Sequence, residues 1–73
     1  MITKDSVQVG DAVHYQPDHY LAEDKFENGI VKEVPEQTIS SIRVVYNCGG
    51  DWGNYKEYTS ALTDCRDLNK GWR

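Results

Sequence analysis

Hydrophobic residues along the chain fall into short alternating or β-branched runs, separated by segments rich in glycine, proline and polar residues. Runs of this kind predict β-strands bounded by turns. The pattern predicts strands within residues 7–15, 29–34, 41–47 and 67–72. Turn signals lie at Gly10-Asp11, at Pro35 and in the segment from Cys48 to Asp51, where two glycines supply positive φ angles.

The intervening stretches are less regular. Residues 16–27 are polar and contain Pro17, which predicts a long loop with a short turn of helix around residues 20–25. Aromatic residues recur at every third position over residues 52–58, and residues 59–66 predict a further helical turn. In all we expect five short strands, four of them in the ranges above, forming a small, mostly-β barrel, since closure of a sheet removes aggregation-prone edges.

The apolar positions also predict a core. We expect its members to be Val13, Ile30, Val34, Ile42, Val44 and Leu68, with Val31 and Val45 more variable in burial. A core of this size suits a single domain spanning residues 1–73, because small chains bury only about 60% of their unfolded surface.

Charge and cysteine content bear on the binding partners and the cellular compartment of the protein. The net charge of −4 disfavours binding to nucleic acid and to anionic lipid. No apolar run approaches the roughly 20 residues of a membrane span, and residues 1–9 lack a charged-then-apolar leader. Two cysteines do not make a disulfide framework, so we expect a protein of the reducing cytoplasm.

Several short motifs occur in a familiar order. They are Gly10-Asp11-x-Val13, Gly29-x-Val31-x-x-Val34, Val44-Val45-Tyr46, Asp51-Trp52-Gly53-Asn54-Tyr55 and Arg66-Asp67-Leu68. The set resembles the small barrels of the SH3-like superfamily, in particular Tudor and KOW modules. The stretch from Val45 to Trp72 is also similar to small bacterial and phage proteins, which implies an accessory protein of the bacterial host cytoplasm.

Large aromatic side chains are the first candidate site. They are Tyr15, Tyr46, Trp52, Tyr55, Tyr58 and Trp72. The resemblance to Tudor modules implies that such rings form a cage for a methylated cation or a flat ligand. Ring faces attract positive charge and stack on planar groups. For Tyr46 and Trp72 we favour a role in filling the thin core, whereas for Trp52 and Tyr55 core and surface roles stay equally open.

Charged residues are the second candidate. The acidic residues Asp18, Glu23, Asp24 and Glu27 would either receive a basic partner or form a solvated loop, which we favour. Arg43, Lys56, Arg66 and Arg73 are candidates to meet the phosphates of a nucleotide.

Metal binding and catalysis are not expected. His14, His19, Cys48 and Cys65 can ligate zinc, but their spacing forms no paired ligand motif. No cofactor is predicted, because Gly49-Gly50-x-x-Gly53 lacks the lysine of a phosphate-binding loop. No local motif supplies a nucleophile with its base, so the sequence predicts a non-enzymatic protein.

Three binding functions remain open. The first is a protein-interaction module that binds or inhibits a host protein through an aromatic-rich face, with or without self-association through that face. The second is a receptor for a small, flat, nucleotide-like ligand, with a pocket built between subunits of a homo-oligomer. The third, disfavoured by charge, is nucleic-acid binding as in KOW modules.

Overall fold

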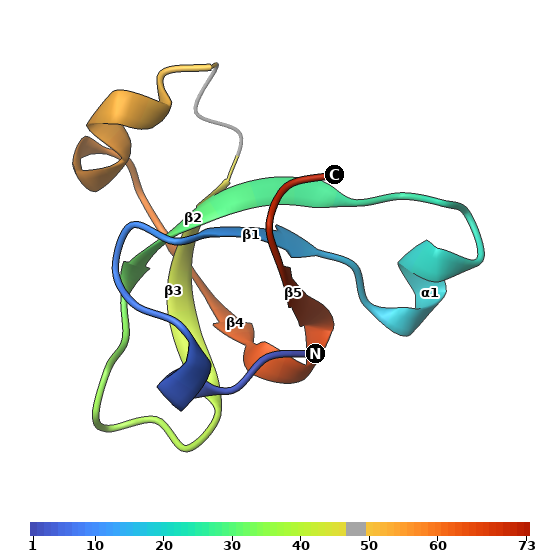
Figure 1. Ribbon diagram of the computed structural model, residues 1–73, viewed down its shortest axis with the longest axis horizontal. Coiled ribbons are helices and arrows are strands. Elements are labelled where there is room, and N and C mark those ends of the chain that lie inside the picture. Colours follow the sequence, from blue (N-terminus) through green and yellow to red (C-terminus); the bar gives the residue numbers. More distant parts are fainter. Residues whose placement is uncertain (47–49) are drawn as a thin grey trace.

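One antiparallel sheet of five strands dominates the protein (Figure 1). The computed structural model describes residues 1–46 and 50–73. The strands are β1 (Ala12–Tyr15), β2 (Glu27–Glu33), β3 (Ser41–Tyr46), β4 (Ala61–Asp64) and β5 (Leu68–Lys70). They lie in the order β4-β3-β2-β1-β5 and curl strongly into a half-barrel, which confirms the predicted mostly-β fold.

Four short helical segments connect or flank the strands. They are η1 (Lys4–Ser6), α1 (Asp18–Leu21), η2 (Trp52–Glu57) and η3 (Cys65–Asp67), of which only α1 is an α-helix and the others are 3-10 turns. The helical turn expected in the polar segment is present, although it begins earlier, directly after Pro17. The turn expected at Cys48 and Gly49 lies outside the described residues.

The prediction of a helical turn over residues 59–66 was wrong. Residues Ala61–Asp64 form β4, and helical geometry is confined to η3. In β4, Thr63 lies opposite Ile42 of β3, so pairing with an established strand decides the conformation of this segment. Strand preference depends on such cross-strand neighbours more than on the residues alone.

The inner face of the curled sheet carries the hydrophobic core. Alternation along each strand places Val13, Val31, Ile42 and Val44 on this face, where all four are fully buried. Ile2, Val7, Cys65 and Leu68 complete the cluster. The N-terminal segment is held against η3 by a hydrogen bond from the Ile2 amide to the Cys65 carbonyl (3.3 Å).

The outer face of the sheet is covered as well. The indole N–H of Trp72 donates to the carbonyl of Gly29 (2.8 Å), and Lys32 Nζ donates to the carbonyl of Tyr58 (2.7 Å). These contacts bring the C-terminal segment and the end of η2 over β2, and Ile30 and Val45 are buried beneath them.

Two expectations about the core are therefore corrected. Val31 and Val45, expected to vary in burial, are fully buried, because the sheet is covered on both faces. Val34 is only half-buried, since it follows β2 and lies beyond the irregular pairing between Val31 and Glu33. The other five predicted core residues are buried.

Among the residues that the structure describes, no helix has the length and apolar character needed to cross a membrane.

Candidate functional site

The inner face opens into a cleft at one end of the half-barrel. The cleft lies where β1 ends, β2 begins and β3 ends, and β4 forms one of its walls. Its volume is about 340 Å³. The residues on which the argument below depends are Tyr15, Glu27, Tyr46, Thr63, Asp64 and Asp67. Ligand pockets span about 300–1,000 Å³, so this cleft suits one side chain or a similarly small group.

Two tyrosine rings, one from β1 and one from β3, meet in the cleft. Tyr15 and Tyr46 pack edge to face, with ring centroids 6.0 Å apart and planes inclined by 67°. Tyr20 of α1 adds a third ring, 5.4 Å from Tyr15 and inclined by 81°. All three residues are half-buried, so the rings pack against the protein and still reach solvent.

The hydroxyl of Tyr46 is fixed in position. It lies 2.9 Å from Thr63 Oγ1, which is buried on the inner face of β4. Burial raises the pKa of Tyr46 to about 12, although the hydrogen bond to Thr63 acts in the opposite direction. Tyr46 is therefore a neutral hydrogen-bonding group in the cleft at physiological pH.

Carboxylates make the cleft electronegative. Burial raises the pKa of Tyr15, and the negative charges of Asp67 and Glu27 raise it further. The same two carboxylates raise the pKa of Tyr46. Both ring hydroxyls therefore experience the field of these acids, and the potential in the cleft favours cations over anions.

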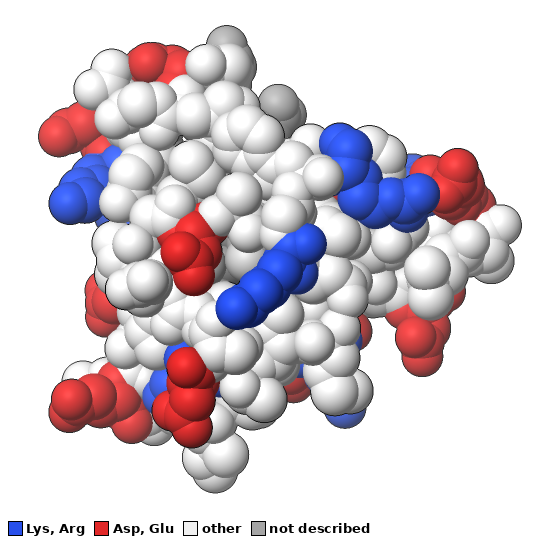
Figure 2. All heavy atoms as spheres, viewed as in Figure 1, with Lys and Arg blue, Asp and Glu red and all other residues white. Residues whose placement is uncertain are grey.

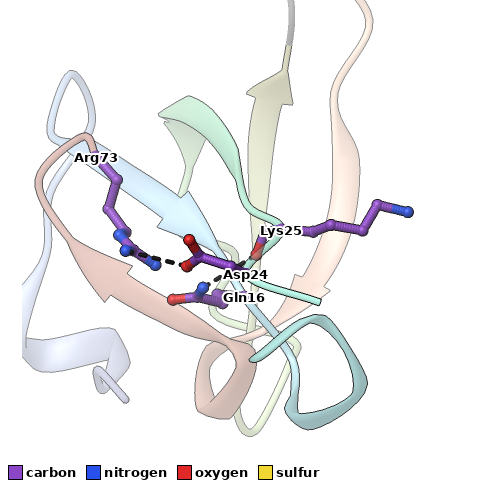
Figure 3. A network of polar contacts seen from close by, with 4 residues as sticks. All are labelled: Gln16, Asp24, Lys25 and Arg73. Atoms are coloured by element: carbon purple, nitrogen blue, oxygen red, sulfur yellow. Dashed lines mark hydrogen bonds and ion pairs between the residues drawn. The ribbon is translucent and has the colours of Figure 1, made fainter. Parts of the chain in front are cut away.

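Polar contacts link the segments on either side of α1 to each other and to the C-terminus (Figure 3). Gln16 Nε2 donates to the carbonyl of Lys25 (3.0 Å), and the Arg73 guanidinium lies 3.4 Å from Asp24 Oδ1. Asp24 adopts a positive φ of 53°, which reverses the chain between α1 and β2. Lys25 Nζ lies 5.3 Å from the centre of the Tyr20 ring. These contacts thus anchor α1, which carries Tyr20.

A second aromatic group lies on the outer side of the sheet. Trp52 of η2 and Trp72 of the C-terminal segment have ring centroids 4.7 Å apart, inclined by 41°. The core role favoured for Trp72 was wrong, because the residue is 45% exposed. Its indole N–H bonds to the sheet at Gly29, and its ring packs against Trp52.

Polar contacts in and beside η2 hold the remaining rings. Asp51 accepts hydrogen bonds from the hydroxyl of Tyr58 (2.8 Å) and the amide of Asn54 (3.1 Å). These bonds lower the pKa of the Asp51 carboxyl. Lys56 Nζ lies 5.9 Å from the centre of the Tyr55 ring. The segment from Asp51 to Tyr58 is therefore held by contacts within itself as well as by those with Trp72 and Lys32.

The structure divides the predicted site residues between these two places. Tyr15 and Tyr46 meet in the cleft, whereas Trp52, Tyr55 and Lys56 belong to η2 and Tyr58 directly follows it.

The basic residues are dispersed in the same way. Arg43 alternates with the inward Ile42 and Val44 and so lies on the outer face. Arg66 forms an exposed ion pair with Asp64 (3.5 Å), and Arg73 pairs with Asp24. Figure 2 shows lysine and arginine side chains interspersed with carboxylates on the face in view, without a continuous basic band.

The four acidic loop residues also separate. Glu27 lines the cleft, while Asp24 pairs with Arg73 and Glu23 pairs with Lys25 (3.5 Å). Sequence reasoning missed Asp64, which precedes η3, Asp67, which ends it, and the hydroxyl of Thr63. The available signal was the position of Asp67 directly before Leu68, a predicted core residue.

Of the residues that can ligate zinc, the described ones make other contacts. His14 Nδ1 donates to the carbonyl of Gly71 (2.8 Å), and the His19 ring packs against Tyr20. Cys65 is buried, and burial raises its thiol pKa. Cys48 lies outside the described residues. Within the described ranges, no group of three or more His, Cys, Asp or Glu side chains is arranged to hold a metal ion.

Comparisons with protein-family models, with curated proteins and with solved structures give no match for this chain.

Proposed function

We propose that this protein is a non-enzymatic binding module whose cleft accepts a positively charged side chain of a partner protein. The observation that carries the proposal is the convergence of two half-exposed tyrosine rings with the carboxylates of Glu27, Asp64 and Asp67. Rings attract cations through their quadrupole, and carboxylates accept charge-assisted hydrogen bonds from them.

The expected affinity for an isolated cation is modest. A partly exposed cation–π contact contributes about 0.5–1 kcal/mol, and a hydrogen bond to a charged group about 1.5–3 kcal/mol. One arginine side chain making one or two of each would bind with a dissociation constant of about 1 mM. An arginine guanidinium suits this site because it is planar, stacks on rings and binds carboxylates in a bidentate manner.

Two further features support binding over catalysis. Cys65 is buried with a raised thiol pKa, which disfavours the reactive thiolate, and His14 is engaged by a backbone carbonyl.

The strand order and small size agree with the resemblance to SH3-like, Tudor and KOW modules. We therefore propose a bacterial or phage accessory protein of the host cytoplasm that binds or inhibits a host protein.

The nucleotide-like ligand remains a second hypothesis with less support. Phosphates would enter the field of Glu27 and Asp67, and Arg43 and Lys56 lie elsewhere, on the outer face and on η2. The same assay separates the two hypotheses, with adenosine monophosphate as the probe for the second.

The test is a titration with arginine methyl ester at constant ionic strength, followed by NMR or tyrosine fluorescence. Citrulline methyl ester has nearly the same shape and the same α-amino group without the side-chain charge, and we expect it to bind at least about tenfold more weakly. The double variant Glu27→Gln/Asp67→Asn should weaken arginine binding by about tenfold.

The matched control is Glu36→Gln/Glu57→Gln, which removes two exposed acids that do not line the cleft and should leave the affinity unchanged. Equal binding of the two esters, or no effect of the cleft variant, would contradict the proposal. Binding of adenosine monophosphate without binding of arginine methyl ester would favour the second hypothesis.

A further inference from the structure

The outer edge of β4 is an open strand edge beside the cleft. Among the strands that the structure describes, β4 pairs only with β3 and ends the sheet on that side. The backbone groups that point outward follow from the register. Cys65 N donates to the carbonyl of Ser40 (2.8 Å), and hydrogen-bonded pairs alternate along an antiparallel ladder. The next bonded pair is therefore Thr63 with Ile42.

It follows that the N–H and C=O groups of Leu62 and Asp64 point away from β3. Asp64 is also the N-cap residue of η3, so its C=O accepts the first bond of that turn. Within residues 1–46 and 50–73, the N–H and C=O of Leu62 and the N–H of Asp64 have no protein hydrogen-bond partner. The Leu62 side chain, on the outer face, is 53% exposed. An edge of this kind is a template for another strand.

The edge and the cleft are continuous. Residues 61–64 all line the cleft, and Thr63 reaches inward to the hydroxyl of Tyr46. A strand added to β4 would present alternate side chains to the inner face. The residue opposite Thr63 would point its side chain into the cleft, between the rings and the carboxylates.

We infer that β4 binds an extended segment of the partner protein as an additional antiparallel strand, with a central arginine or lysine placed in the cleft. This inference rests on the proposed function and specifies the form of the partner. The residues on either side of the cation would bond to the N–H and C=O of Leu62 and to the N–H of Asp64. Their side chains would lie on the outer face beside Leu62, so we expect them to be apolar and β-branched.

Charge argues for a basic partner over a second copy of this chain. The protein carries a net charge of −4, and the cleft beside the edge is lined by three carboxylates. Pairing two copies through β4 would bring two such clefts together, and like charges directly opposite each other destabilise a strand pair. A cationic segment instead gains charge complementarity at the same edge.

The probe is the blocked peptide acetyl-Thr-Val-Arg-Val-Thr-amide, in which the two valines would face Leu62 and Asp64. We expect it to bind about tenfold or more tightly than arginine methyl ester, because each added backbone hydrogen bond contributes about 0.5–1.5 kcal/mol. N-methylation of both valines should return the affinity to that of the ester. Replacing arginine by citrulline should weaken binding by a similar factor.

Hydrogen exchange gives a residue-specific readout. Peptide binding should slow exchange of the Leu62 and Asp64 amides, whereas the Thr63 amide already bonds to β3 and should change less. Leu62→Pro removes one outward N–H at an edge position where proline is tolerated, and should abolish the tenfold gain. Leu62→Ala keeps the amide and serves as the matched control. The N-methylated peptide tests the same bond in the unaltered protein.

The outcomes separate this inference from the function on which it rests. Binding of arginine methyl ester, with no tighter binding by the peptide and no amide protection, would overturn strand pairing and leave the cation site standing. Equal binding of the arginine and citrulline peptides, with protection of Leu62, would overturn the cation site and keep the edge. Concentration-dependent dimerisation that protects the same amides without peptide would overturn the partner and assign the edge to a second copy.

Discussion

Gly29→Ala adds one methyl group where β2 and β3 lie against each other. The new Cβ would lie 2.6 Å from Val44 Cγ1, 2.8 Å from the Val45 carbonyl oxygen and 3.0 Å from Tyr46 Cδ1. Two of these distances are far inside van der Waals contact, and Val44 is fully buried, so it has no space into which to move. The two strands must separate to admit the methyl group.

The cost follows from packing. Overfilling a well-packed core costs about 1–3 kcal/mol, and the reduced freedom of alanine in the unfolded chain offsets about 0.4–1 kcal/mol. We expect a net loss of about 1–2 kcal/mol in the free energy of unfolding. For a domain of this size that corresponds to a decrease of roughly 5–15 °C in the melting temperature.

Chemical denaturation and thermal melting measure this loss, and Gly53→Ala is the control. A Cβ at Gly53 has no atom within 4 Å, and its backbone does not adopt a positive φ, so stability should change by less than about 0.5 kcal/mol. Because the displaced strand carries Tyr46, Gly29→Ala should also weaken binding of arginine methyl ester. Equal stability of the two variants would refute the steric argument.

Two further predictions concern the core and the cleft. Ile42→Ala, which empties a fully buried site, should cost about 2–5 kcal/mol and leave the domain largely unfolded, which a normal melting curve with an unchanged midpoint would contradict. Because the pKa of Tyr46 rises from 10.0 to about 12 on folding, its contribution to stability is complete below pH 10 and is lost as the pH rises through 12. This alkaline loss of stability is about 2 kcal/mol or less after solvent screening. Tyr46→Phe should reduce the loss, which denaturation across that pH range would measure.

Runs of β-branched residues were the local pattern that predicted strands. Residues 29–34 and 41–47 alternate or cluster valine and isoleucine, and β2 and β3 form there. β4 lacks such a cluster, and its four residues become a strand because β3 offers them a partner. Burial of Val45 was missed for a similar reason, since two distant segments cover the outer face.

The candidate site was predictable in its chemistry and unpredictable in its geometry. The sequence singled out the aromatic side chains as a candidate binding site, and no described tyrosine, tryptophan or phenylalanine is fully buried. Which rings converge depends on register. Tyr15 and Tyr46 share a face because each lies two residues from an inward valine, Val13 and Val44 respectively. Trp52 and Trp72 meet only because the C-terminal segment returns over β2, which no local pattern encodes.

The location of cation binding tests the account most directly. Ring signals of all the tyrosines and tryptophans can be followed by NMR while arginine methyl ester is added. The account predicts that Tyr15 and Tyr46 shift together and saturate with one dissociation constant, while Trp52 and Trp72 stay unchanged. Shifts at the two tryptophans with unchanged signals from Tyr15 and Tyr46 would contradict it.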